Sequence, residues 1–293
     1  MTTATATAAN TLAPTVHSPT RARQTEGHLT FAGILRSEWI KLASLRSIRW
    51  SIITMLLVSA AGAALMSFAM VDTGSVDADT LPTLLAQSAT FGSNITVLIM
   101  GVIGVLAATS EYSSGMILST LSAAPRRGLL LTAKALVVAG IAFVVGGLST
   151  LGGGVIAALF MGGDAFGVLV SPAVLASMLG TTIYLTLATL LSLGIGVIFR
   201  SGAGAISVVV LLLFVSTLVF QILSVTGWAW VPEAAQWLPA DLGYEMSSSP
   251  LLPADAPTEM VGVGYWAALG GLVAWAGAAL VPAAILLKTR DAV

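Results

Sequence analysis

The chain alternates long apolar runs with short polar segments. A helix rises about 1.5 Å per residue, so about 20 apolar residues cross the bilayer core, which is about 30 Å thick. Six runs reach this length, and they lie near residues 50–71, 88–109, 131–161, 172–199, 204–225 and 262–287. The pattern predicts an all-α integral membrane protein with six transmembrane helices. The glycines at 146–147 and 152–154 of the third run indicate either a bend or close helix packing.

Residues 29–49 have the pattern of an amphipathic helix. On a helical wheel, the apolar residues within about 80° of Phe31 are Ile34, Leu35, Trp39, Leu42 and Leu45. Glu38 interrupts this apolar face. A cationic helix that carries a tryptophan is typical of the membrane surface. The segment is therefore expected to anchor the first span, or also to contact a cytoplasmic partner through Glu38 and Lys41.

Composition agrees with a membrane protein. Hydrophobic residues make up 57% of the chain and charged residues only 9%, whereas soluble domains carry about 25% charged residues. The net charge of −1 gives no general attraction to nucleic acid, and the lack of cysteine excludes disulfides and thiolate metal sites. Residues 1–28, rich in Thr and Ala, are expected to be a disordered cytoplasmic tail before a membrane domain at 29–290.

The distribution of charge predicts the orientation. All twelve cations lie before the first run, in the 110–134 loop, at Arg200, or after the sixth run. The loops on the opposite side carry acids and no cations. By the positive-inside rule, both termini are expected in the cytoplasm. The largest outer loop, residues 226–261, contains three tryptophans and is expected to form an interfacial cap.

Several kinds of chemistry are missing from the sequence. It contains no G-x-x-x-x-G-K-[ST] phosphate loop and no H-E-x-x-H metal motif. We place no ionisable residue in the middle of any apolar run, although ion-driven carriers commonly need one. No catalytic set, metal site or cofactor is therefore expected, and energy for any transport has to come from another polypeptide.

The loop after the second run has a distinct pattern. Glu111 opens it, at a depth where the carboxylate either stays hydrated or pairs with Arg126, Arg127 or Lys134. Ser113 or Ser114 can cap a short helix over about 114–123, which Pro125 would end. A helix across the ends of two spans could act as a lever, but spacing alone favours an ordinary cationic loop.

The residues of two segments resemble a known family. Glu111, Gly115, Leu121, Pro125, Arg126, Arg127 and Lys134, in this order, resemble the first cytoplasmic loop of ABC-2 type transporter permeases. The segment from Ser37 to Ser47 is similar to the start of the same family, especially its members from high-G+C Gram-positive bacteria. Met116 departs from the pattern, because the family commonly has Thr there.

The resemblance implies a function. Such permeases lie in the bacterial plasma membrane, have no nucleotide site of their own, pair as homodimers or heterodimers, and dock on ABC ATP-binding subunits. The implied coupling loop comprises Glu111, Gly115, Pro125, Arg126, Arg127 and Lys134, and the implied interface helix carries Glu38, Trp39, Lys41 and Arg46. An exporter of a hydrophobic drug, lipid or peptide is expected. The alternative is a non-transporting membrane protein that acts as an anchor, sensor or assembly factor.

Overall fold

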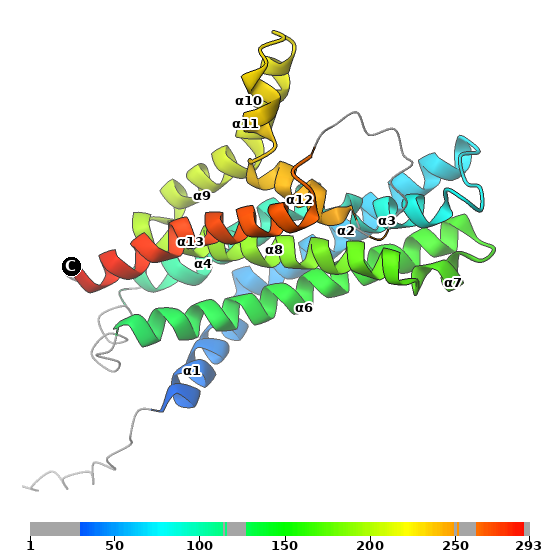
Figure 1. The fold of residues 1–293 in the computed structure, drawn as a ribbon. Coiled ribbons are helices and arrows are strands. Elements are labelled where there is room, and N and C mark those ends of the chain that lie inside the picture. Colours follow the sequence, from blue (N-terminus) through cyan, green and yellow to red (C-terminus); the bar gives the residue numbers. More distant parts are fainter. Residues whose placement is uncertain (1–29, 114, 116–126, 249–250, 252–261, 290–293) are drawn as a thin grey trace, which may run out of the picture.

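Six apolar helices form an elongated bundle (Figure 1). The computed structural model describes residues 30–113, 115, 127–248, 251 and 262–289, and all regular structure within these ranges is helical. The helices of membrane-spanning length comprise α2 (Arg46–Asp72), α3 with α4 (81–112), α6 (Arg127–Met161), α8 (Pro172–Phe199), α9 to α10 (202–224) and α13 (Tyr265–Thr289). The prediction of six transmembrane helices is confirmed.

The second membrane helix is longer than predicted and is divided by Gly92. Helix α3 (Leu81–Phe91) ends at this glycine and α4 (Ser93–Ser113) begins after it. A Cβ on Gly92 would lie 2.7 Å from Ser59 Cα of α2, so only glycine allows the two backbones to approach this closely. By contrast, α6 runs unbroken through its glycines, and a Cβ on Gly153 would lie 2.6 Å from the Ala89 carbonyl oxygen. Close packing therefore explains Gly153 and Gly154, whereas no atom lies within 4 Å of a Cβ on Gly152.

Helix α8 is the centre of the bundle. In its most apolar stretch 67% of the residues are buried, against 11% in the fifth span. It packs mainly on α4, α13 and α6, and the short helix α7 (Ala165–Leu169) precedes it. A Cβ on Gly194 would lie 2.7 Å from the carbonyl carbon of Ala279 in α13, so the backbones of these two helices are in direct contact. The other helices are therefore positioned relative to α8.

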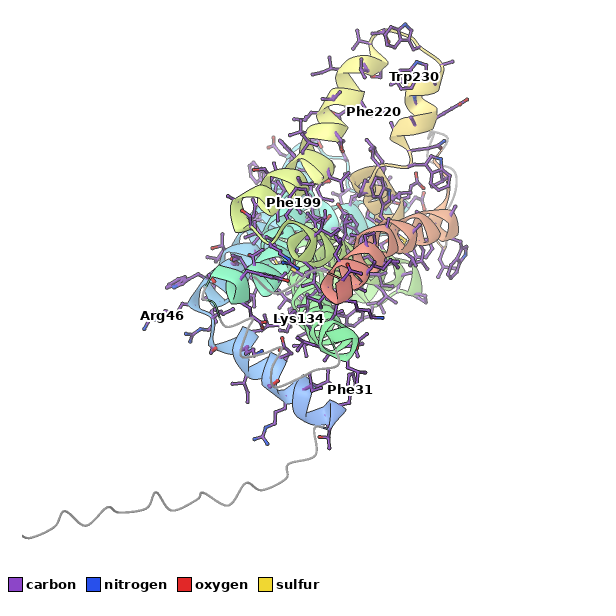
Figure 2. The ribbon with its side chains drawn as sticks, turned by 90° about the vertical axis from the view of Figure 1, so that its left-hand side faces the viewer. Phe31, Arg46, Lys134, Phe199, Phe220 and Trp230 are labelled. Atoms are coloured by element: carbon purple, nitrogen blue, oxygen red, sulfur yellow. The ribbon has the colours of Figure 1, made fainter. Side chains whose placement is uncertain are left out.

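The fifth span lies at the edge of the bundle. Its α-helical parts, α9 (Gly202–Val210) and α10 (Ser216–Ser224), are joined by the π-helical turn η1 (Leu211–Val215). Helix α10 and the following α11 (Trp230–Ala235) project from the body of the molecule (Figure 1). Phe220 and Trp230 meet edge to face in this projecting arm, with ring centroids 6.3 Å apart (Figure 2).

A further helix, α12 (Pro239–Ser247), lies within the segment that was expected to be only an interfacial cap. It packs on α8 and α13. Two glycines make this contact close: a Cβ on Gly180 of α8 would meet the Met246 carbonyl oxygen, and one on Gly243 would meet the Tyr184 ring. This part of the loop is therefore built into the bundle.

We predict that Gly104→Ala destabilises the contact between α4 and α8. Its methyl group would meet the Thr189 carbonyl oxygen and lie 3.0 Å from Ser192 Cβ. Overpacking of this kind costs about 1–3 kcal/mol, so the midpoint of thermal unfolding in detergent should fall. Gly140→Ala in α6 is the matched control, because no atom lies within 4 Å of a Cβ placed there. Equal midpoints for the two variants would contradict the close contact.

We also predict that Asp241→Asn in α12 stabilises the protein at neutral pH. Burial raises the pKa of the Asp241 carboxyl, partly offset by a hydrogen bond to its own backbone, and its Oδ2 accepts no hydrogen bond among the described residues. Protonation therefore adds stability below the ordinary Asp pKa, and this contribution is lost as the pH rises through the folded-state pKa. The unfolding midpoint of the variant should exceed that of the parent at about pH 7.5, by a margin that shrinks toward about pH 4. An unfolding midpoint of the variant below that of the parent at neutral pH would contradict the predicted stabilisation.

Candidate functional site

The first helix places a carboxylate inside the protein. Helix α1 (Phe31–Ser44) begins at Thr30, whose Oγ1 accepts a hydrogen bond from the Gly33 N–H at 3.2 Å. Its buried residues, Ile34, Glu38 and Leu42, recur every four positions and so share one face. Ile34 packs with Leu130 and Ala133 near the start of α6. Glu38, which interrupts the apolar pattern in the sequence, therefore lies on the inner face of α1 and is fully buried.

Four charged side chains from three helices meet there, and we call them the charge network: Glu38 and Lys41 of α1, Glu111 of α4 and Lys134 of α6. The Lys41 ammonium lies 2.7 Å from Glu38 Oε1 and 3.2 Å from Glu111 Oε1. The Lys134 ammonium lies 2.8 Å from Glu111 Oε1 and 2.6 Å from Glu38 Oε2. The last contact is ionic, because Glu38 Oε2 accepts no hydrogen bond among the described residues.

The network is buried and its charges balance. Glu38 is 0%, Glu111 5% and Lys134 6% exposed. Lys134 also donates a hydrogen bond to the Ala107 carbonyl oxygen at 3.2 Å, so all three of its N–H groups have an oxygen within reach. Removing one member of a buried pair leaves its partner uncompensated, which typically costs about 3–5 kcal/mol. The arrangement therefore holds α1 to α4 and α6 in one geometry.

Lys41 forms the exposed rim of the network, with 26% of its side chain accessible. Burial acts to lower the pKa of Lys41, but its hydrogen bond to Glu38 and the charges of Glu111 and Glu38 outweigh that effect. Its pKa therefore lies above the ordinary lysine value. Lys41 stays protonated at neutral pH and supplies a permanent positive charge beside the two carboxylates.

The structure brings together four of the residues that we predicted: Glu38 and Lys41 of the first helix, and Glu111 and Lys134 of the loop. Glu111 pairs with Lys134, one of the partners considered from the sequence, and with Lys41, and it is only 5% exposed. Trp39 is 54% exposed, and Arg46 is exposed at the start of α2. Lys134 is labelled in Figure 2, on the part of α6 near α1.

The remaining residues of the predicted coupling loop are described only in part. Gly115 is exposed and has a φ of 69°, a left-handed conformation that favours glycine. Arg127 opens α6. Pro125, Arg126 and the predicted short helix at about 114–123 lie outside the described residues, apart from Gly115.

A neighbouring contact was not predicted from the sequence. Arg200, which we had used only as an orientation charge, ends α8 in a left-handed conformation with a φ of 54°. Its guanidinium carbon lies 5.6 Å from the centre of the Tyr112 ring in α4, within cation–π range. A lone arginine after an apolar run does not indicate which ring it will contact. Beside the network, this pair joins α8 to α4.

The site is suited to mechanical linkage. Within the described part of the chain, no group of three or more His, Asp or Glu side chains is placed to hold a metal ion. The carboxylates of the network are instead neutralised by lysines. The site therefore consists of paired charges that join three helices. These helices belong to a bundle whose members are long enough to cross a membrane.

These features define a polytopic helical membrane protein with the charge network at one end of the bundle. A family model described as "ABC-2 family transporter protein" matches residues 34–217, more than half of the chain, so the chain belongs to this family. The match begins within α1 and includes all four network residues. A comparison with curated proteins gave no match. Membership implies the permease component of an ABC transporter, which associates with ABC ATP-binding subunits and is generally not itself an enzyme.

We predict that Lys134→Met destabilises the protein by about 3–5 kcal/mol, because it leaves the carboxylates of Glu38 and Glu111 with Lys41 alone. The measurement is the midpoint of thermal unfolding in detergent. Asp72→Asn is the control, since this exposed acid lies at the far end of α2. The exchange Glu111→Lys with Lys134→Glu should not recover the loss, because it sets like charges against Lys41 and Glu38. A midpoint for Lys134→Met equal to that of the control would show that the buried pairing contributes little.

Proposed function

We propose that this chain is the permease subunit of an ATP-driven exporter, and that the charge network carries movement from the ATP-binding subunits into the membrane helices. The observation that carries the proposal is the joining of α1, α4 and α6 by four mutually neutralised charges, three of them buried. Both termini are assigned to the cytoplasm, because every cation of the sequence falls on one side of the predicted topology.

The network is well suited to transmit force. Two of its members, Glu111 and Lys134, flank the 112–133 segment in sequence. A partner that displaces this segment would pull on α4 and α6 where their charges are paired. A partner that displaces α1 would act on the same helices through Glu38 and Lys41. In a low-dielectric surrounding, separating these charges is costly, so the three helices are expected to move together.

The 111–127 segment is the proposed contact with the ATP-binding subunit. Pro125, Arg126 and Arg127 are its proposed contact residues, together with Gly115. The exposed surface of α1 is the second proposed contact. It includes Trp39 at 54% and Ile40 at 55% exposure, whereas Glu38 on the opposite face holds α1 to the bundle.

A complete translocation path would need a second permease, either another copy of this chain or a similar protein. Closure of the ATP-binding subunits would tilt the joined helices and alternate the path between inward- and outward-facing states. The exported substrate is expected to be a hydrophobic drug, a lipid or a peptide. The resemblance to the family supports the outward direction of transport.

We predict that Lys41→Gln uncouples the transporter with little loss of fold. Lys41 is partly exposed, so its removal should cost less stability than that of Lys134, while it still weakens the link between α1 and Glu111. The variant should co-purify with the ATP-binding subunit encoded by a neighbouring gene, but stimulate its ATPase activity at least about threefold less than the parent does, equivalent to about 0.7 kcal/mol. Arg49→Gln is the matched control, because Arg49 is an exposed cation near the start of α2, outside both proposed contacts.

A second variant tests the proposed contact. Reversing the charges of Arg126 and Arg127 to Glu should weaken co-purification itself, because it places acids at the proposed docking surface. The coupling assignment fails if Lys41→Gln stimulates ATP hydrolysis as strongly as Arg49→Gln and the double reversal still assembles normally. Failure of both the parent chain and the control to bind any ATP-binding subunit would instead count against the permease function.

A further inference from the structure

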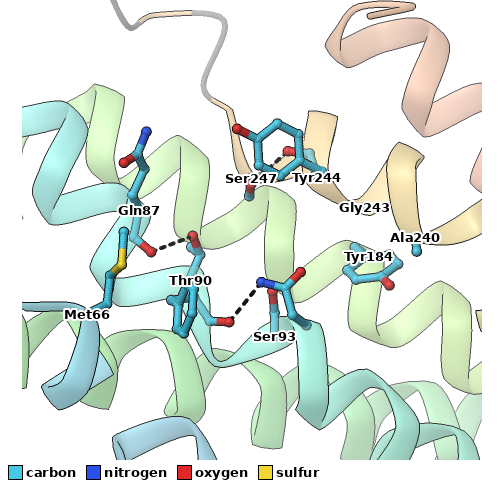
Figure 3. Close-up of a pocket in the computed structure, with 11 residues that line it drawn as sticks. Met66, Gln87, Thr90, Ser93, Tyr184, Ala240, Gly243, Tyr244 and Ser247 are labelled. Atoms are coloured by element: carbon cyan, nitrogen blue, oxygen red, sulfur yellow. Dashed lines mark hydrogen bonds between the residues drawn. The ribbon is translucent and has the colours of Figure 1, made fainter. Parts of the chain in front are cut away.

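A pocket lies away from the charge network, where α12 meets α3, the start of α4, and α8 (Figure 3). Its volume is about 290 Å³. Met66 of α2 closes one side and Ala240 of α12 lies on another. Ligand pockets commonly measure about 300–1,000 Å³, so this one is large enough for a small molecule or for the head of a larger one.

The polar side chains of the pocket are uncharged. Amides come from Gln87 and Asn94, and hydroxyls come from Thr90, Tyr184, Tyr244 and Ser247. No Asp, Glu, Lys or Arg is among the described residues that line it. A charged ligand would lose its hydration here, and no residue that lines the pocket supplies an opposite charge, which is unfavourable. The charge of Asp241 in α12 acts on Tyr184, although Asp241 does not line the pocket. A neutral ligand with hydroxyl or amide groups could exchange hydrogen bonds with water for hydrogen bonds with these side chains.

Tyr184 brings a phenol to the pocket. It lies within α8, is 4% exposed, and lines the pocket. Its phenol forms no hydrogen bond within the described part of the chain, although buried tyrosine hydroxyls usually find a partner. Gly243 of α12 lies over the hydroxyl end of the ring, since a Cβ there would clash with it. The ring is therefore held in place, and no group of the described residues hydrogen-bonds its hydroxyl.

Two amides of the pocket also have unused hydrogen-bonding capacity. Asn94 donates one hydrogen bond, at 3.0 Å, to the Phe91 carbonyl oxygen, which leaves its own carbonyl oxygen available (Figure 3). The Gln87 side chain forms no hydrogen bond within the described residues. Thr90 and Ser247 donate to backbone oxygens of their own helices and can still accept. The side chains of the pocket, Tyr184 included, therefore offer a ligand both hydrogen-bond donors and acceptors.

We propose that this pocket recognises the uncharged, hydroxyl- or amide-bearing head of an amphiphile that the transporter carries. The apolar part of the molecule would lie along Met66 and Phe91 at the pocket's edge, where the Phe91 ring is 39% exposed. This inference rests on the proposed permease function and adds the class of substrate to it.

The binding test uses the full chain in lipid nanodiscs and three probes with the same apolar tail: octyl glucoside, octyltrimethylammonium and octyl sulfate. Each is titrated below its critical micelle concentration by calorimetry, with empty nanodiscs subtracted. The neutral glucoside should bind saturably, and at least about tenfold more tightly than either charged probe. Equal affinity for the three heads, or no saturable binding, would overturn the proposal.

Two variants test whether the glucoside binds in this pocket. Tyr184→Phe removes only the hydroxyl and should weaken glucoside binding by about three- to tenfold, and Gln87→Leu should do the same. The matched control for the second variant is Gln221→Leu, which changes an exposed glutamine of α10 outside the pocket. Unfolding midpoints confirm that each variant is folded. Glucoside binding that is unchanged in both pocket variants would overturn the assignment to this pocket.

A last measurement separates a transported molecule from a lipid that merely resides in the pocket. In the complete complex with its ATP-binding subunits, octyl glucoside should stimulate ATP hydrolysis, and Tyr184→Phe should reduce that stimulation about three- to tenfold at subsaturating probe. Binding without stimulation would identify a resident lipid and overturn the substrate assignment. Such a result would leave the proposed function intact, because that function is tested without any probe, by assembly and by the Lys41 variant.

Discussion

Burial of ionic groups is the constraint on which the arrangement of the first helices depends. Glu38, Glu111 and Lys134 are far enough from water that none can lose its partners cheaply, and Lys41 pairs with both carboxylates from a partly exposed position. Their pairing determines where α1 lies and at what depth the ends of α4 and α6 meet. Hydrophobic contacts, such as that of Ile34 with Leu130, support this position but are less directional. A change in the angle of α1 would therefore require the charges to find new partners.

Backbone contact between helices is the second constraint. Inside a bilayer, the hydrophobic effect gives little net force between apolar helices, so packing and small residues hold them together. Glycines allow α8 to touch α4, α12 and α13 closely. The fifth span, by contrast, remains at the edge with little burial. The charge network is thus attached to a closely packed group of helices. A displacement of α1 would be passed on through the contacts between these helices.

Much of the fold is predictable from the sequence, because long apolar runs have few alternatives to membrane helices. The pairing of Glu111 with Lys134 was one of the partnerships that the sequence suggested. Burial of Glu38 was not predictable, since a helical wheel treats a charge on an apolar face as an interruption until its partners on other helices are known. Helix α12 was missed because Asp241 and Glu245 give a short segment the composition of a surface loop. Its contact with α8 depends on Gly180 and Gly243, which are far apart in sequence.

The π-helical turn η1 sets the direction of the projecting aromatic arm. A π turn holds one residue more than an α turn, and one residue corresponds to a rotation of about 100° around a helix. If residues 211–215 continued as a regular α-helix instead, the extra residue would rotate the chain after it by about 100°, and α10 would point its side chains to a different side. The azimuth of Phe220, and of Trp230 that contacts it, therefore depends on the π turn, which takes up one residue without rotating the helix that follows.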